Sequence, residues 1–126
     1  MKFSLDKQEK YAILTLQEEN LNSVLAPDLK SEFVFLRNEG VPNLIFNMEH
    51  VKYVDSSGLS AILTANRLWN NYGSFVLASV VHPTVKKLIE ISRLQDILNI
   101  VPTVEESIDL VIMDQLEKEL NEEEDQ

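Results

Sequence analysis

The sequence predicts an α/β domain with a small, largely parallel β-sheet, about four helices and an N-terminal β-hairpin. Short apolar runs typical of strands alternate along the chain with segments whose apolar residues have helical spacing, and this alternation favours a parallel sheet. Most of the three glycines and four prolines fall where one of these segments ends. The length of 126 residues suits one compact domain, and the 44% hydrophobic content provides material for its core.

Residues 3–17, FSLDKQEKYAILTLQ, are predicted to form two short strands joined by a charged turn. The alternation of residues along the second strand places its side chains on two faces of the sheet. One face would carry Ala12, Leu14 and Leu16, and the other Tyr11, Ile13 and Thr15.

The first helix is predicted over residues 22–40, with Asn22 or Ser23 as its N-cap. Pro27 falls in the first turn, where its missing N–H costs nothing, and Gly40 ends the helix. The apolar stripe of this helix consists of Leu25, Leu29, Phe33 and Leu36.

The rest of the chain continues the alternation of strands and helices. Strands are predicted over residues 43–48, 74–81 and 97–101, and helices over residues 57–72, 82–94 and 103–120. Thr103 and Glu106 have the spacing of a capping box at the start of the last helix. Trp69 is predicted to pack beneath this last helix.

The formal net charge of −10 opposes binding to nucleic acid and to anionic membranes, because like charges repel. Between Asp114 and Gln126, seven carboxylates and one lysine contribute −6 of this charge. Residues 114–126 are therefore predicted to be an acidic helix end or tail that follows a domain of residues 1–113. The chain has no cysteine, no apolar run of membrane-spanning length and no signal peptide, which predicts a cytoplasmic protein without disulfides.

The stretch VKYVDSSGLSAIL, residues 51–63, leads from a β-branched and aromatic run into a predicted helix. Asp55 or Ser56 can cap this helix, and Ser57 and Gly58 begin it. Ligand and partner sites of open α/β sheets gather at such junctions, at the carboxyl ends of strands. The two serines can cap the helix, attack a substrate or receive a phosphate.

Catalysis by these serines lacks support in the sequence. A nucleophilic serine needs a base and an oxyanion hole, but His50 and His82 are the only histidines and neither lies in a motif that places it beside the serines. DSSG does not match the G-x-S-x-G pattern, and no G-x-x-x-x-G-K loop is present. A lone histidine beside one carboxylate is a poor metal site. We therefore expect no enzyme activity, no metal and no cofactor.

Phosphate acceptance fits the stretch better. A hydroxyl on the first turn of the helix is expected to be exposed, and Gly58 to leave room for a kinase to approach the backbone. The helix dipole would stabilise the phosphate by ~0.3–1 kcal/mol. The phosphate would also add about −1.5 to −2 charge beside Asp55. These effects are small and opposed within the domain, so the modification would switch binding rather than folding. The residues themselves do not choose between Ser56 and Ser57.

Together with NLIFNME before it and FVLASVVHPTVKKLIEISRL after it, this stretch resembles the STAS domain family, and especially bacterial anti-sigma-factor antagonists. The resemblance covers about Phe3 to Met113, and D-S-S-G-L is its most specific motif. In that family, a partner kinase that is also an anti-sigma factor phosphorylates the second serine, and a phosphatase restores it. The unphosphorylated form binds the anti-sigma factor and frees the sigma factor.

The resemblance implies that Ser57 is the phosphate acceptor, and that the partners are an anti-sigma factor/serine-protein kinase and a phosphatase. The partner-binding residues that it implies are Asn22, Ser23, Asp55, Ser56, Ser57, Gly58 and Leu59. STAS-like domains also dock constitutively in transport or sensory assemblies, which is the alternative function. The apolar content of the last helix leaves a homodimer contact open.

Two positions depart from the family pattern near the expected site. Asn47 lies in the third strand where an aspartate is often found, and Asn22 precedes the first helix where an acid is frequent. Both departures change the local charge and bear on the choice of partner, while the expected fold is unaffected.

Overall fold

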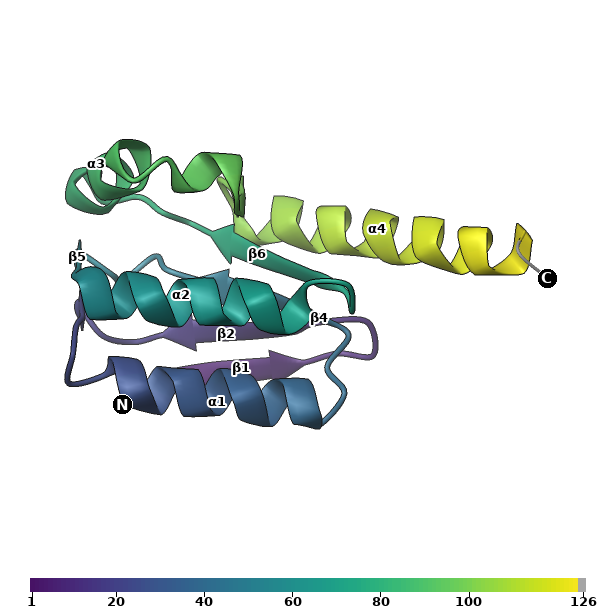
Figure 1. Ribbon diagram of the computed structural model, residues 1–126, viewed down its shortest axis with the longest axis horizontal. Coiled ribbons are helices and arrows are strands. Elements are labelled where there is room, and N and C mark those ends of the chain that lie inside the picture. Colours follow the sequence, from purple (N-terminus) through teal and green to yellow (C-terminus); the bar gives the residue numbers. More distant parts are fainter. Residues whose placement is uncertain (125–126) are drawn as a thin grey trace.

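The computed structural model describes residues 1–124, which form a five-stranded sheet with helices on both faces (Figure 1). The strands are β1 (Phe3–Lys7), β2 (Ala12–Leu16), β4 (Asn43–Asn47), β6 (Ser74–Ala78) and β7 (Asn99–Val101), in the order β1-β2-β4-β6-β7. β1 and β2 form an antiparallel hairpin, and the other neighbouring strands are parallel. The predicted mixed, largely parallel sheet with an N-terminal hairpin is confirmed.

Four helices accompany the sheet, as predicted. They are α1 (Ala26–Asn38), α2 (Ser56–Trp69), α3 (Pro83–Ile91) and α4 (Val104–Glu124), with a short 3₁₀ turn, η1 (Leu94–Asp96), after α3. α1 and α2 lie side by side across one face of the sheet (Figure 1). The start of α4 packs on the opposite face, and the helix then extends beyond one end of the sheet (Figure 1).

A second, two-stranded sheet was not predicted. β3 (Asn20–Leu21) pairs in parallel with β5 (Tyr53–Val54), so the segments that lead into α1 and α2 lie side by side. This small sheet brings together the starts of the two helices, although they are far apart in the sequence.

The alternation along β2 divides its side chains between two cores, as predicted. Ala12, Leu14 and Leu16 are fully buried in the larger core, which they share with α1, α2 and α3. On the other face, Tyr11 and Ile13 pack against the smaller core around Val111 of α4. Because burying one such aliphatic side chain contributes ~1.5–3 kcal/mol, these two cores hold the helices on the sheet.

Trp69 lies in the larger core and is fully buried. Its indole Nε1 donates a hydrogen bond to the carbonyl oxygen of Val41 at 3.0 Å, and its ring stacks on Phe75. The prediction that Trp69 packs beneath the last helix was wrong, since α4 covers the opposite face of the sheet.

α1 begins at Ala26, later than predicted, and Leu25 occupies its N-cap position without a side-chain hydrogen bond. The prediction that Asn22 or Ser23 caps the helix was therefore wrong. Asn22 instead closes the turn before α1, where its Oδ1 accepts hydrogen bonds from the backbone N–H groups of Val24 at 3.0 Å and Leu25 at 3.4 Å. Gly40 follows the helix with φ of +87°, which confirms its predicted role as the terminator.

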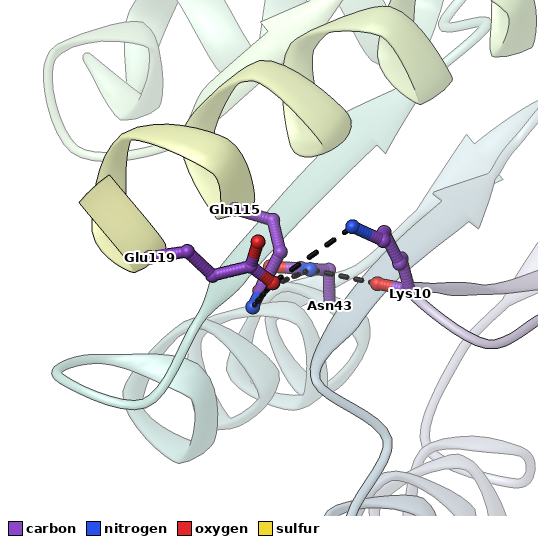
Figure 2. Close-up of polar contacts among 4 residues, drawn as sticks. All are labelled: Lys10, Asn43, Gln115 and Glu119. Atoms are coloured by element: carbon purple, nitrogen blue, oxygen red, sulfur yellow. Dashed lines mark hydrogen bonds and ion pairs between the residues drawn. The ribbon is translucent and has the colours of Figure 1, made fainter. Parts of the chain in front are cut away.

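The side-chain amide of Asn43 joins α4 to the sheet (Figure 2). Its Nδ2 donates to the carbonyl oxygen of Lys10 at 2.7 Å and to Oε1 of Gln115 at 3.3 Å, and its Oδ1 accepts from the N–H of Ser74 at 2.8 Å. Only 1% of Asn43 is exposed, so these hydrogen bonds replace water. One buried amide thus connects the hairpin turn, β4, β6 and α4.

α4 begins as the capping-box spacing predicted, because the N–H of Glu106 donates to Oγ1 of Thr103 at 3.1 Å. The helix is continuous through Glu124 and so spans the expected domain limit after Met113. Residues 125 and 126 of the expected tail lie outside the described residues. Over residues 1–124, none of the helices combines the length and the apolar character that crossing a bilayer requires.

Candidate functional site

Asp55 connects the starts of α1 and α2 with its two carboxylate oxygens. It is the N-cap of α2, where its Oδ1 accepts a hydrogen bond from the N–H of Gly58 at 2.9 Å. Its Oδ2 accepts from the N–H of Ser23 at 3.2 Å, in the loop before α1. The predicted cap is confirmed, and the same carboxylate also fixes the neighbouring loop.

All three predicted site serines, Ser23, Ser56 and Ser57, line one surface hollow between the starts of α1 and α2, with a volume of about 360 Å³. Ser56 is exposed and Ser57 is half-buried, both on the first turn of α2. The full lining consists of Ser23, Ala26, Pro27, Lys30, Ser56, Ser57 and Ser60. Because the first N–H groups of a helix lack intrahelical partners, this hollow lies at the electropositive end of α2.

Lys30 brings a positive charge to this hollow and was not among the predicted site residues. Its Nζ donates a hydrogen bond to Oγ of Ser60 at 3.1 Å, which connects α1 to α2. Residues 26 and 30 are one helical turn apart, so this spacing could have placed Lys30 on the same side of α1 as Ala26. The side of α1 that carries Ala26 and Lys30 packs against the start of α2 through tertiary contacts. The sequence spacing within α1 does not reveal these contacts.

Gly58 lies beneath the hollow rather than at its surface. It is buried, and a Cβ atom at this position would lie 2.5 Å from the carbonyl oxygen of Leu21 and 2.9 Å from Cγ1 of Val54. The expectation that Gly58 leaves room for a kinase to approach was wrong. The missing side chain instead allows α2 to pack closely against β3 and β5.

The predicted partner-binding residues Asn22 and Leu59 do not line the hollow. Asn22 forms the turn before α1, and Leu59 is half-buried and packs against the larger core. Asn47, at the end of β4, makes its hydrogen bonds with Thr15 and Glu49. The structure therefore brings Ser23, Ser56 and Ser57 together, with Asn22, Asp55 and Gly58 supporting them.

The two histidines lie elsewhere on the surface. His50 and His82 line a different hollow of about 580 Å³, together with Glu49 and Lys52. His50 Nε2 lies 3.5 Å from a carboxylate oxygen of Glu49, and this pair becomes an ion pair when the histidine is protonated. In the part of the chain that the structure describes, no three acidic, histidine or cysteine side chains are grouped so that they could hold a metal ion.

Several solved structures have the same fold as this chain. Bacillus SpoIIAA in its phosphorylated form is 25% identical, with a TM-score of 0.66 over 87% of this chain and 99% of that one. An anti-sigma factor antagonist from Mycobacterium paratuberculosis has a TM-score of 0.79 at 15% identity, over 87% of this chain and 92% of that one. A sulfate transporter family protein from Wolinella succinogenes has a TM-score of 0.66 at 13% identity, over 80% and 84% of the two chains.

The family model for the STAS domain matches residues 2–107, which include β1 to β7 and the start of α4. This match confirms the resemblance seen in the sequence. The TM-scores of 0.66 to 0.79 show that the overall fold is shared with these structures. The chain therefore belongs to the STAS domain family.

Proposed function

We propose that this protein is an anti-sigma-factor antagonist of the cytoplasm whose binding is switched by phosphorylation of Ser57. In its unphosphorylated form it binds an anti-sigma factor that is also a serine kinase, and a sigma factor is freed. Phosphorylation by that kinase ends the binding, and a phosphatase restores it. The protein itself is a binding module without enzymatic activity.

The observation that carries this proposal is the hollow at the start of α2, in a chain with the D-S-S-G-L motif. Ser57 lies on the first helical turn and lines the hollow together with Ser23 and Lys30. SpoIIAA, which is named an anti-sigma factor antagonist, has the same fold and has been solved in a phosphorylated form. The family motif favours the second of the two serines, while the hollow contains both.

The charges around the hollow support a switch that leaves the fold intact. A phosphate adds about −1.5 to −2 charge, and its repulsion from Asp55 is opposed by the dipole of α2 and by the ammonium group of Lys30. Inside a packed interface, the same charge meets a desolvated partner surface, where an unfavourable charge costs several kcal/mol. Phosphorylation should therefore weaken binding far more than it weakens the fold.

The test uses the full chain and a candidate anti-sigma factor with serine kinase activity, chosen from the genes that neighbour the one for this chain. Incubation with ATP should add one phosphate, which peptide mass spectrometry should map to Ser57. Ser57→Ala should bind the candidate without accepting phosphate. Ser57→Asp should bind at least about tenfold more weakly, which corresponds to ~1.4 kcal/mol.

Ser56→Ala is the matched control, because Ser56 lies on the same turn and lines the same hollow. This variant should still accept one phosphate, at Ser57. Phosphate on Ser56, or binding that Ser57→Asp leaves unchanged, would contradict the proposed switch.

A second function is favoured by the likeness to the sulfate transporter family protein, which shares the fold at a TM-score of 0.66. In that case the same surface would dock constitutively on a subunit of a transport or sensory complex. Affinity purification from native cells separates the two functions: a kinase-type anti-sigma factor supports the first, and a transporter or sensor subunit supports the second. Binding that Ser57→Asp leaves unchanged would also favour the second.

A further inference from the structure

The outward face of α4 carries three large apolar side chains that nothing else in the described chain covers. Met113, Leu116 and Leu120 are 60%, 43% and 59% exposed. Their spacing of three and then four residues places them in one stripe along the helix. A contiguous exposed stripe of this kind marks an interaction surface more often than do scattered single residues.

Polar contacts hold the opposite face of α4 against the domain. The helix therefore cannot rotate to bury the apolar stripe against the rest of the chain. Ser74 Oγ and Asp114 Oδ2 are 3.1 Å apart, Asn43 Nδ2 donates to Gln115, and Lys118 Nζ donates to the carbonyl oxygen of Tyr72 at 2.6 Å. Figure 2 shows Gln115 and Glu119 directed from α4 toward Asn43 and Lys10. Polar residues of the second half of α4 thus face the domain while its apolar residues face away, the reverse of an ordinary surface helix.

Carboxylates border the apolar stripe along its length. Helical spacing places Asp109 one turn before Met113, Glu117 between Leu116 and Leu120, and Glu123 one turn after Leu120, and all three carboxylates are exposed. Lys118, the lysine of this helix, is directed toward Tyr72 and away from the stripe. The outward face of α4 is therefore apolar along its centre and negative along its borders.

We propose that this face of α4, centred on Met113, Leu116 and Leu120, docks in an apolar groove of another protein whose rim carries lysine and arginine. Such a groove matches both the apolar centre and the acidic borders of the stripe. A second copy of this chain would instead bring two acidic borders together, and an anionic membrane would repel them. Charge complementarity therefore favours the basic protein groove over these two alternatives.

The surface lies apart from the serine hollow. The start of α2 and the second half of α4, which carries Leu116 and Leu120, lie toward opposite ends of the molecule (Figure 1). The stripe also lies beyond residue 107, where the match to the family model ends. The proposal thus concerns a second partner, and the two surfaces can be occupied at the same time.

A synthetic helical peptide serves as the probe, with leucines on one face and lysines bordering them. A control peptide carries glutamate in place of each lysine. Titration of the ¹⁵N,¹³C-methyl-labelled full chain should shift the methyl signals of Met113, Leu116 and Leu120 with the lysine peptide only. Affinity should fall at least tenfold in the Leu116→Gln/Leu120→Gln double variant, and it should weaken with added salt.

Phe35→Gln provides the matched control variant, because Phe35 is a similarly exposed apolar residue on α1. This variant should bind the lysine peptide as the unmodified chain does, and thermal melts should show that both variants remain folded. Absence of binding, or binding that the leucine replacements leave unchanged, would overturn the proposal. Sedimentation that reveals self-association abolished by Leu116→Gln/Leu120→Gln would also overturn it, because a second copy would then occupy the face.

Discussion

At the scale of single residues, Asp55 has two separate structural roles. Its Oδ1 caps α2 through Gly58, and its Oδ2 holds the N–H of Ser23. We expect Asp55→Ala to lower the free energy of unfolding by ~0.5–2 kcal/mol, since that is the usual cost of losing an N-cap. Urea denaturation would measure this change.

Asp55→Asn is the conservative comparison for the same position. An asparagine has one carbonyl oxygen and can retain the cap while losing the contact with Ser23. Its stability should therefore lie between those of Asp55→Ala and the unmodified chain. Equal stability of all three proteins would show that neither contact contributes measurably.

Gly58 is required for close packing rather than for backbone freedom. We expect Gly58→Ala to destabilise the protein by ~1–3 kcal/mol, because the added Cβ would overpack a site 2.5 Å from the Leu21 carbonyl oxygen. Ser56→Ala, at an exposed position on the same turn, should change the stability much less. Thermal or urea unfolding of the two variants compares them directly. A stabilised Gly58→Ala, as helix propensity alone would favour, would contradict the packing argument.

The residues that could be predicted at the site are those whose role is local in sequence. Asp55 caps the helix that starts one residue later, so its position alone indicated the role. The tasks of Gly58 and Lys30 depend on Leu21 and Ser60, which lie on other segments. No local pattern encodes such contacts, and the surface role expected of Gly58 was accordingly wrong.

At the scale of elements, Asn43 determines how α4 sits on the sheet. We expect Asn43→Ala to cost ~1–3 kcal/mol of unfolding free energy, because the N–H of Ser74 and the carbonyl oxygen of Lys10 lose a buried partner. Hydrogen exchange should show faster opening of α4 in this variant. Asn121→Ala, at an exposed position of α4, is the control and should leave both quantities nearly unchanged. Unaltered exchange in Asn43→Ala would show that the other contacts of α4 hold the helix without this amide.

Five strands and four helices of the fold followed from apolar periodicity, glycine and proline. β3 and β5 did not, since each has two residues and exists only through its pairing with the other. The start of α1 was placed too early because Asn22 is a good N-cap by type, whereas its side chain closes the turn that directly precedes the helix. Sequence patterns thus predict long periodic segments, but they do not predict short segments that form only through tertiary contacts.

At the scale of the whole molecule, the net charge is −10. The excess carboxylates repel one another in the compact state and so destabilise the fold. The ion pairs found in the described residues, such as Lys52 with Glu19 and Lys10 with Glu119, are exposed and contribute little. Raising the salt concentration shortens the Debye length from about 30 Å at 0.01 M to about 8 Å at 0.15 M. We therefore expect the melting temperature to rise by a few degrees over this range, as measured by calorimetry.

Glu122→Gln/Glu123→Gln removes two of the negative charges and is the comparison for the salt dependence. Its melting temperature should respond less to salt than that of the unmodified chain. A melting temperature that falls with salt would show that the surface ion pairs outweigh the net repulsion.

The strand order leaves β1 and β7 at the two edges of the sheet, where unpaired backbone groups could recruit a strand from another chain. Asp6 and Lys7 place charges on β1, while β7 has three residues and is followed at once by Pro102, which has no N–H to donate. Both edges are therefore poor templates for pairing with a strand from another chain. Partners consequently have to recognise side chains on the helices and loops, because the sheet offers them little backbone to pair with.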